Sequence, residues 1–257
     1  MTSVRPADAC LIDLDGTLYQ GERAIPGAPE AVAALRTAGI ALRFTTNTTR
    51  VPRTTLAERL AGLGIPASAH EIHTAPVAAV RWLAAAGARR LMLLLAEATV
   101  EEFTTFVRDH ETPDQVVVGD LGEAWTFEVL DRAFRALHRG AGLVAIQKNR
   151  WWDAGDGPRL DAGPFVAALE YASGREAVLV GKPSAAFFTA AAADLGLPRE
   201  RIAAVGDNLE TDIRGARGVG CLGIAVRTGS FREQDLRATP ADAVLDSIAD
   251  LPRWLGL

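Results

Sequence analysis

The feature of this sequence that most restricts its fold is an alternation of short apolar runs with Ala- and Leu-rich stretches at both ends of the chain. Strand-like runs begin at Ala9 and Ile40, and a helical stretch from Pro29 to Ala38 separates them. The pattern returns near the C-terminus, with strand-like runs at 177–181, 201–205 and 221–226. Strands that alternate with helices form parallel sheets. We therefore predict an α/β fold in which both ends of the chain build one doubly wound sheet.

The middle of the chain carries its own strand-like runs, which start at Leu91, Val116 and Leu143. Helical stretches lie between them, so this region reads as a second α/β unit inserted into the first. We predict a Rossmann-like core from residues 1–76 and 177–257, and an inserted α/β domain from residues 77–176.

Composition excludes several classes of function. The formal charge of −5 and a pI near 5.5 disfavour binding to nucleic acid or anionic membranes. The most apolar run, Leu91 to Ala96, is far shorter than the ~20 residues of a membrane-spanning helix. Two cysteines, Cys10 and Cys221, are too few for a disulfide framework, and no signal peptide is visible. We expect a cytoplasmic protein, with a homodimer as one open option for its assembly.

The strongest chemical signal is "DLDGT", which follows the apolar run "ACLI". It places Asp13 and Asp15 at a strand end, where ligands bind in open α/β sheets, and Gly16 in the following turn. Side chains two residues apart in a strand face the same side, so both carboxylates can address one substrate. The alternative is a polar turn with two solvated aspartates.

Two weaker signals follow other strand-like runs. Thr46 and Asn47 offer a hydroxyl and an amide before a helix, which suits a phosphoryl group, although Thr46 taken alone is better explained as a helix cap or turn residue. Lys182 precedes another helix and could neutralise a carboxylate and a phosphate, the alternative being a surface lysine. The chain has only two lysines, Lys148 and Lys182, which favours a specific need for the ammonium group.

The fourth signal is "VGDNLETD", with Asp207 after a strand-like run and Asp212 five residues later. Clustered carboxylate oxygens suit Mg²⁺. A capped helix start is the alternative.

Together these four motifs, in this order, resemble the haloacid dehalogenase superfamily, and most closely its phosphatases with a large α/β cap. The segments "VLVGKPSAAFF" and "VRTGSFR" are similar to the phospholysine phosphohistidine inorganic pyrophosphate phosphatases and their relatives. The resemblance implies a phosphatase that acts on a small phosphorylated substrate, with Asp13 as nucleophile and Asp15 as general acid and base.

The resemblance also implies the remaining roles. Thr46, Asn47 and Gly16 would hold the phosphoryl group, and Lys182 would bridge nucleophile and phosphate. Mg²⁺ would be bound by Asp13, the Asp15 carbonyl and Asp207, with Asp212 orienting a water ligand.

In the cap, "KNRWWDAGDG" from Lys148 is the segment that we expect to contact the rest of the substrate. Lys148 and Arg150 would meet an anionic group, and Trp151 would form a wall, unless the segment is a hairpin with ordinary packing aromatics. Three other readings stay open: a phosphomutase, a metal-independent dehalogenase and a phosphate-binding regulator without turnover.

Overall fold

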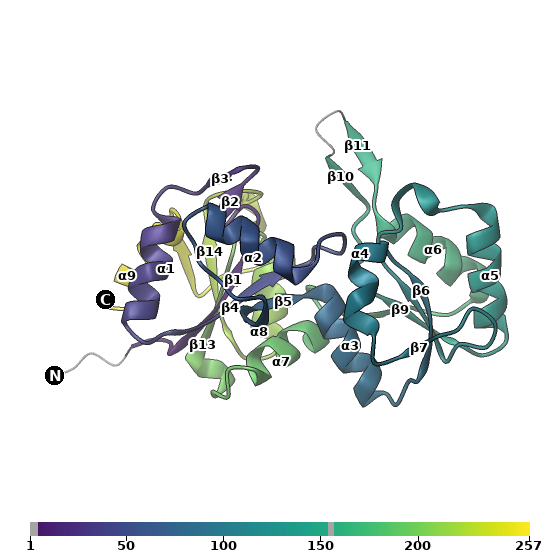
Figure 1. The fold of residues 1–257 in the computed structure, drawn as a ribbon. Helices are drawn as coiled ribbons and strands as arrows, with labels where there is room; N and C mark the ends of the chain where they lie inside the picture. Colours follow the sequence, from purple (N-terminus) through teal and green to yellow (C-terminus); the bar gives the residue numbers. More distant parts are fainter. Residues whose placement is uncertain (1–4, 154–156) are drawn as a thin grey trace. The chain divides into compact units, whose positions relative to one another are not determined.

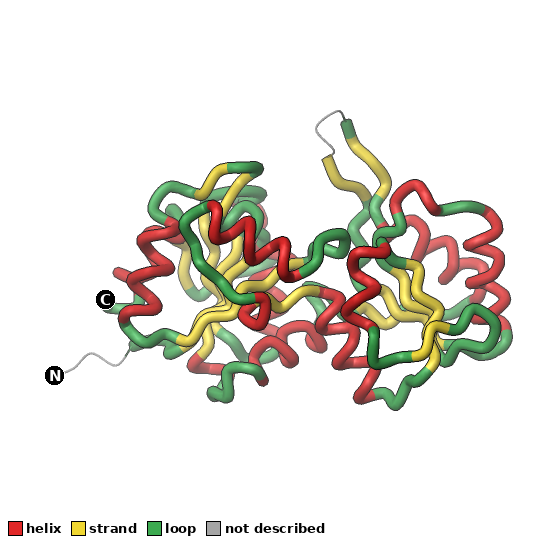
Figure 2. Tube along the Cα trace, viewed as in Figure 1, coloured by secondary structure: helices red, strands yellow, loops and turns green. Residues whose placement is uncertain are grey.

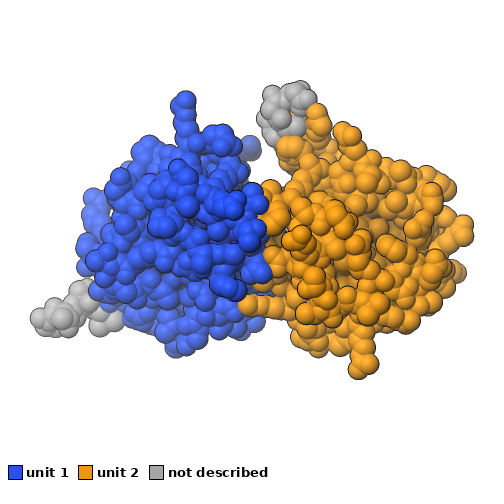
Figure 3. Space-filling model, in the orientation of Figure 1, with its two compact units in different colours: residues 1–46, 53–73, 182–257 blue, residues 47–52, 74–181 orange. Residues whose placement is uncertain are grey.

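The computed structural model describes residues 5–153 and 157–257 and divides into two compact units. Unit 1 comprises residues 1–46, 53–73 and 182–257, and unit 2 comprises residues 47–52 and 74–181 (Figure 3). The sequence placed the division at 76/77 and 176/177, whereas the units change at 73/74 and 181/182. The short segment 47–52 packs with unit 2, although the residues on both sides of it belong to unit 1.

Unit 1 is built on a six-stranded sheet with β1 near its centre (Figure 1). β1 pairs in parallel with β13 on one side and β4 on the other, and β14 and β15 continue the parallel pairing beyond β13. The sheet order is β15 (Ala243–Leu245), β14 (Leu222–Val226), β13 (Ile202–Gly206), β1 (Ala9–Asp13), β4 (Ala41–Thr46) and β5 (Ile72–Thr74). All five residues of β1 are buried, which matches the unbroken apolar run of a central parallel strand.

Helices connect these strands, as the alternating sequence predicts. The predicted helix at Pro29–Ala38 corresponds to α1 (Ala28–Thr37), and the helix predicted after Lys182 corresponds to α7 (Ala185–Ala193), which is capped by the hydroxyl of Ser184. The other helical segments of unit 1 are α2 (Arg53–Gly62), η1 (Ala69–Glu71), η4 (Arg199–Arg201), the π-helical η5 (Leu209–Arg214), α8 (Gly215–Gly218), η6 (Glu233–Arg237), η7 (Ile248–Asp250) and α9 (Leu251–Trp254). A small hairpin, β2 (Tyr19–Gln20) and β3 (Arg23–Ala24), follows β1.

Unit 2 has its own parallel sheet of five strands. Their order is β12 (Val178–Leu179), β9 (Gly142–Ala145), β8 (Gln115–Val118), β6 (Arg90–Leu94) and β7 (Val107–Arg108). Figure 1 shows α5 and α6 on one face of this sheet and α3 and α4 on the other. The helical segments are α3 (Ala75–Ala85), α4 (Glu97–Val100), η2 (Glu101–Phe103), η3 (Gly122–Ala124), α5 (Phe127–His138) and α6 (Ala162–Ser173). A hairpin of β10 (Trp151–Asp153) and β11 (Pro158–Leu160) extends from the unit.

This architecture confirms the predicted fold class. Helices and strands alternate along both units, as the tube view shows (Figure 2), and a second α/β unit is inserted between the two parts of the first. Over residues 5–153 and 157–257, none of the helices combines the length and the apolar character that crossing a membrane requires.

Candidate active site

The four sequence motifs meet at the carboxyl edge of the unit 1 sheet. Asp13 is the last residue of β1, Thr46 is the last residue of β4, and Asp207 follows directly after β13. β4 and β13 flank β1 on opposite sides. From β1 the chain continues to β4 and β5 on one side of the sheet, and from β13 it continues to β14 and β15 on the other. The boundary between β1 and β13 is therefore a switch point of the kind where open α/β sheets bind ligands.

Lys182 forms a buried ionic bridge between two of the aspartates. Its ammonium Nζ lies 2.5 Å from Oδ1 of Asp13 and 2.7 Å from Oδ1 of Asp212, and it also donates to the Thr45 carbonyl at 3.4 Å. Lys182 is 4% exposed, so the surface-lysine alternative is wrong. Burial alone favours the neutral amine, but the carboxylates of Asp13 and Asp212 outweigh it and raise the pKa of Lys182. The lysine is therefore held as a cation.

Opposing effects act on the pKa of Asp13, the candidate nucleophile. Burial raises the pKa of the Asp13 carboxyl, the cation of Lys182 lowers it, and the charges of Asp212 and Asp207 raise it again. The net direction is upward, so Asp13 holds its proton more tightly than an ordinary aspartate. Its Oδ2 accepts a hydrogen bond from the Thr17 hydroxyl at 3.3 Å, which helps to orient the carboxyl group.

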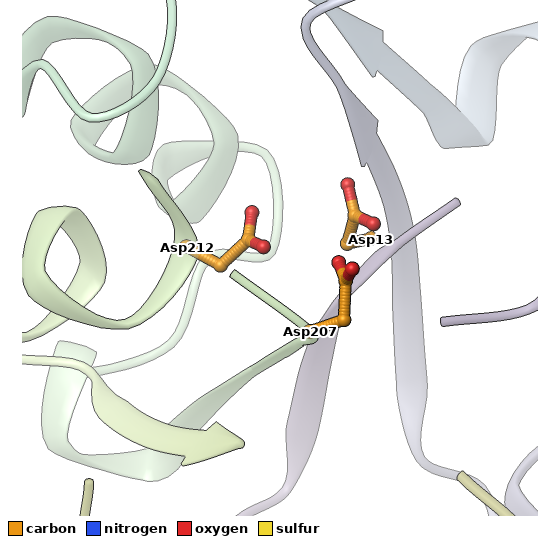
Figure 4. A group of neighbouring side chains, drawn as sticks. All are labelled: Asp13, Asp207 and Asp212. Atoms are coloured by element: carbon orange, nitrogen blue, oxygen red, sulfur yellow. The ribbon is translucent and has the colours of Figure 1, made fainter. Parts of the chain in front are cut away.

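Three buried carboxylates form a candidate metal site. One oxygen from each of Asp13, Asp207 and Asp212 lies within 4.8 Å of the others (Figure 4). Burial raises the pKa of Asp207, and Asp212 adds to this, while the Ser230 N–H, which donates to Asp207 at 2.6 Å, acts in the opposite direction. Hard oxygen donors gathered in this way suit a divalent cation such as Mg²⁺, which would relieve their mutual repulsion.

Two glycines make room for this cluster. Gly16 and Gly229 have positive φ angles of 83° and 57°, and a Cβ at either position would overlap the carboxylate of Asp207. Only glycine combines this backbone conformation with such close approach. Gly16 therefore has a structural reason to follow the "DLD" motif.

Asp15 lies on the loop between β1 and the β2–β3 hairpin and is exposed. Desolvation by neighbouring atoms raises the pKa of its carboxyl, and the charge of Arg59 and the Gly16 backbone N–H oppose this rise. Asp15 is thus the acid of the motif that remains open to a ligand and to solvent, in contrast to the buried Asp13.

The other predicted contacts are placed as follows. Thr46 is buried at the end of β4, and the adjoining Asn47 belongs to unit 2. In unit 2, the ammonium of Lys148 is paired with Glu170 at 2.8 and 3.0 Å, which ties the loop after β9 to α6. Arg150 is exposed, and Trp151 is 61% exposed. The part of this predicted segment at residues 154–156 lies outside the described residues.

Several contributors were not predicted from the sequence. The backbone N–H of Ser230 and the hydroxyl of Thr17 contact the central carboxylates, and Arg59 acts on Asp15. A backbone donor leaves no signature in residue type, so Ser230 carried no signal. Thr17 lies in the "DLDGT" motif itself and could have been included on that ground.

Comparison with known proteins gives matches over both units. A family model described as haloacid dehalogenase-like hydrolase matches residues 10–107, and a model described as HAD-hydrolase-like matches residues 179–251. The chain is 42% identical over 235 residues to haloacid dehalogenase-like hydrolase domain-containing protein 2 of Rattus norvegicus, covering 91% of this chain and 90% of that protein. It is 35% identical over 248 residues to the phospholysine phosphohistidine inorganic pyrophosphate phosphatase of Bos taurus, covering 93% and 91%.

Solved structures resemble the whole chain. The 4-nitrophenylphosphatase of Thermotoga maritima superposes with a TM-score of 0.89 at 28% identity, covering 96% of this chain and 97% of that one. The glycerol phosphate phosphatase of Mycobacterium tuberculosis, solved in complex with magnesium, has a TM-score of 0.85 at 29% identity, covering 97% and 76%.

Proposed function

Because the chain belongs to the haloacid dehalogenase-like hydrolases, as the motifs predicted, we propose that it is a Mg²⁺-dependent phosphatase that works through an aspartyl-phosphate on Asp13. Its substrates would be small phosphorylated molecules. Relatives and structural neighbours that are named phosphatases support the reaction class. The observation that carries the proposal is the buried Asp13 carboxylate, held by Lys182 beside two further carboxylates at the carboxyl edge of the sheet.

In the first step, a carboxylate oxygen of Asp13 would attack phosphorus while the bond from phosphorus to the leaving oxygen breaks. Asp15, the exposed acid of the motif, would donate its proton to that leaving oxygen. In the second step, the Asp15 carboxylate would accept a proton from water as the water oxygen attacks phosphorus. The bond between phosphorus and Asp13 then breaks, and inorganic phosphate is released with both aspartates restored.

An attack of one anion on another needs compensating positive charge. Lys182 already supplies one buried cation against Asp13. The residues that would hold Mg²⁺ are Asp13 and Asp207 by their carboxylates, Asp15 by its backbone carbonyl, and Asp212 through a water. When bound, the ion would supply Lewis-acid stabilisation of the phosphoryl oxygens. Thr46, Asn47 and the Gly16 backbone would add hydrogen bonds to the same oxygens.

Substrate choice would reside in unit 2, since the motifs of unit 1 address only the phosphoryl group. Arg150 and Trp151 are exposed and are available for contact with the remainder of a substrate. Lys148 would first have to leave Glu170, so we give it a smaller share of recognition. A cytoplasmic location and a homodimer stay predictions.

The test is a hydrolysis screen over sugar phosphates, nucleotides, pyrophosphate and phospho-amino acids with Mg²⁺, combined with Asp13→Asn. The substitution should lower turnover by several orders of magnitude, because loss of a nucleophile typically does so. Rapid acid quenching and mass spectrometry should find phosphate on the peptide that contains Asp13 in the wild-type protein and not in the variant.

Asp8→Asn is the matched control, because Asp8 precedes the same strand at its opposite end and pairs with Arg201. It should keep wild-type turnover. More than about a hundredth of wild-type activity in Asp13→Asn would refute the covalent role. Full hydrolysis of phosphate esters in chelator would refute the Mg²⁺ dependence, and metal-independent turnover of a haloacid without hydrolysis of any phosphate ester would favour the dehalogenase reading. Transfer of phosphate to a second sugar would favour the mutase reading. Phosphate binding without turnover of any substrate would favour the regulator.

A further inference from the structure

Arg59, on α2, reaches the hairpin that follows the catalytic loop. Its Nη2 donates to the Gly21 carbonyl at 2.6 Å and to the Glu22 carboxylate at 3.3 Å. The centre of its guanidinium group lies 4.4 Å from the centroid of the Tyr19 ring. The Arg59 side chain thus contacts the β2–β3 hairpin in three ways. It makes a charge-assisted hydrogen bond to Gly21, an ion pair with Glu22 and a cation–π contact with Tyr19.

This hairpin is directly tied to Asp15. The Gly16 N–H donates to the Tyr19 carbonyl at 2.7 Å, and Asp15 and Tyr19 form an isolated β-bridge. β2 and β3 have only two residues each, and so short a hairpin is not stable by its own backbone hydrogen bonds. The position of the Asp15 loop is therefore coupled to the hairpin, and the Thr228 hydroxyl holds the same loop by donating to the Gly16 carbonyl at 2.5 Å.

The helix that carries Arg59, α2, is packed against the core of unit 1. α2 buries Leu56 and Leu60, so the helix that carries Arg59 is fixed in the core of unit 1. Tyr19 is 3% exposed and lies beneath the guanidinium group. Arg59 connects a packed helix to the loop that bears Asp15.

We propose that Arg59 is a positioning residue, which holds the β2–β3 hairpin so that Asp15 can protonate the leaving group. This inference rests on the proposed function, in which Asp15 is the general acid. Arg59 itself needs no contact with the substrate. A shift of about 1 Å in a catalytic group costs on the order of a hundredfold in rate, so loss of the anchor is expected to be visible in turnover.

The test exploits the leaving group. An alkyl alcohol needs a proton from Asp15 as it departs, whereas 4-nitrophenolate leaves readily without one. In Arg59→Ala, kcat/KM for an alkyl phosphate should fall at least about thirtyfold, and kcat/KM for 4-nitrophenyl phosphate by less than about threefold. Arg59→Lys should recover part of the loss, because an ammonium can still donate to the Gly21 carbonyl. A loss of equal size on both substrates would overturn the proposal.

The chain offers a closely matched control in Arg36, on α1. Its side chain is 36% exposed, as is that of Arg59. Like Arg59, it has a carboxylate partner, Glu71 at 2.7 Å, a carbonyl acceptor, Pro66 at 3.0 Å, and an aromatic ring, Phe44 at 5.9 Å. These partners are not part of the β2–β3 hairpin. Arg36→Ala should leave both substrates within about twofold of wild type, and a selective loss on the alkyl phosphate would count against the role of Arg59.

Two further measurements separate this inference from the proposed function. If Arg59 acts through Asp15, Arg59→Ala in an Asp15→Asn background should lower the residual rate by less than about twofold, and a full additive loss would refute it. Amide exchange of the peptide spanning residues 15–24 should be faster in Arg59→Ala than in wild type or Arg36→Ala. Unchanged exchange would overturn the positioning role even in a protein without phosphatase activity. A wild-type protein that hydrolyses no phosphate ester, with faster exchange in Arg59→Ala, would instead refute the proposed function alone.

Discussion

Removal of the buried ammonium of Lys182 is the sharpest test of the electrostatics of the site. In Lys182→Met, the side chain keeps its approximate length, but Asp13, Asp207 and Asp212 are left without their buried cation. Breaking a buried ion pair by removing one partner costs about 3–5 kcal/mol, because the remaining charge is uncompensated. For a chain of this size, that corresponds to a fall in Tm on the order of 10 °C.

The sign of the pH dependence follows from the same charges. Lys182 lowers the pKa of Asp13, so its removal raises that pKa further above the unfolded value. Ionising a carboxyl group whose folded pKa is raised destabilises the fold, and this penalty shrinks as the pH falls below the folded pKa and vanishes at the unfolded value. The folded pKa of Asp13 in the wild-type protein is about 8, so below that pH the carboxyl is protonated in both proteins and carries the same penalty. The additional stability lost in Lys182→Met should therefore grow as the pH rises above about 8 and be smaller at lower pH.

Denaturant and thermal unfolding in chelator, at about pH 9.5 and about pH 6.5, measure this effect on either side of the folded pKa of Asp13. Lys148→Met is the control, since it removes the only other lysine, whose pair with Glu170 is partly exposed. We expect less than about 1 kcal/mol from that change. A Lys182→Met variant as stable as wild type at about pH 9.5, or one with the same deficit at both pH values, would refute this account of the site.

Three further outcomes are expected. Titration with Mg²⁺, followed by differential scanning fluorimetry, should raise the Tm of the wild-type protein. Asp207→Ala should abolish that rise, whereas Asp212→Ala should only reduce it. Arg150→Ala should change the ranking of substrates in the hydrolysis screen, whereas Thr46→Val should lower all of them together; changes under about twofold in kcat/KM would make Arg150 irrelevant to recognition. Burial raises the pKa of Cys10 to about 12, so this thiol should resist iodoacetamide at pH 8 in the native protein and react after denaturation. Rapid alkylation of Cys10 in the native protein, detected by mass spectrometry, would contradict its burial.

The sequence by itself predicted the fold class, and it singled out the aspartates of the candidate site. Strand and helix periodicity is a local property, and it predicted two α/β units, although the predicted boundaries at 76/77 and 176/177 differ from the changes at 73/74 and 181/182 in the structure. Asp13 and Asp207 could be assigned to one edge because parallel strands bring their carboxyl ends together. The family resemblance, carried by the four motifs, added the expected roles.

Only the tertiary structure decided how the charges are partnered. Lys182 lies 169 residues from Asp13 along the chain yet contacts it directly. Lys148, which has the same side chain, instead forms an ion pair with Glu170. Arg59 holds the loop of Asp15, although nothing in its local sequence separates it from the other arginines. The physical reason is that periodicity depends on neighbours in the chain, whereas ion pairing and burial depend on strand order and helix packing, which bring distant residues together.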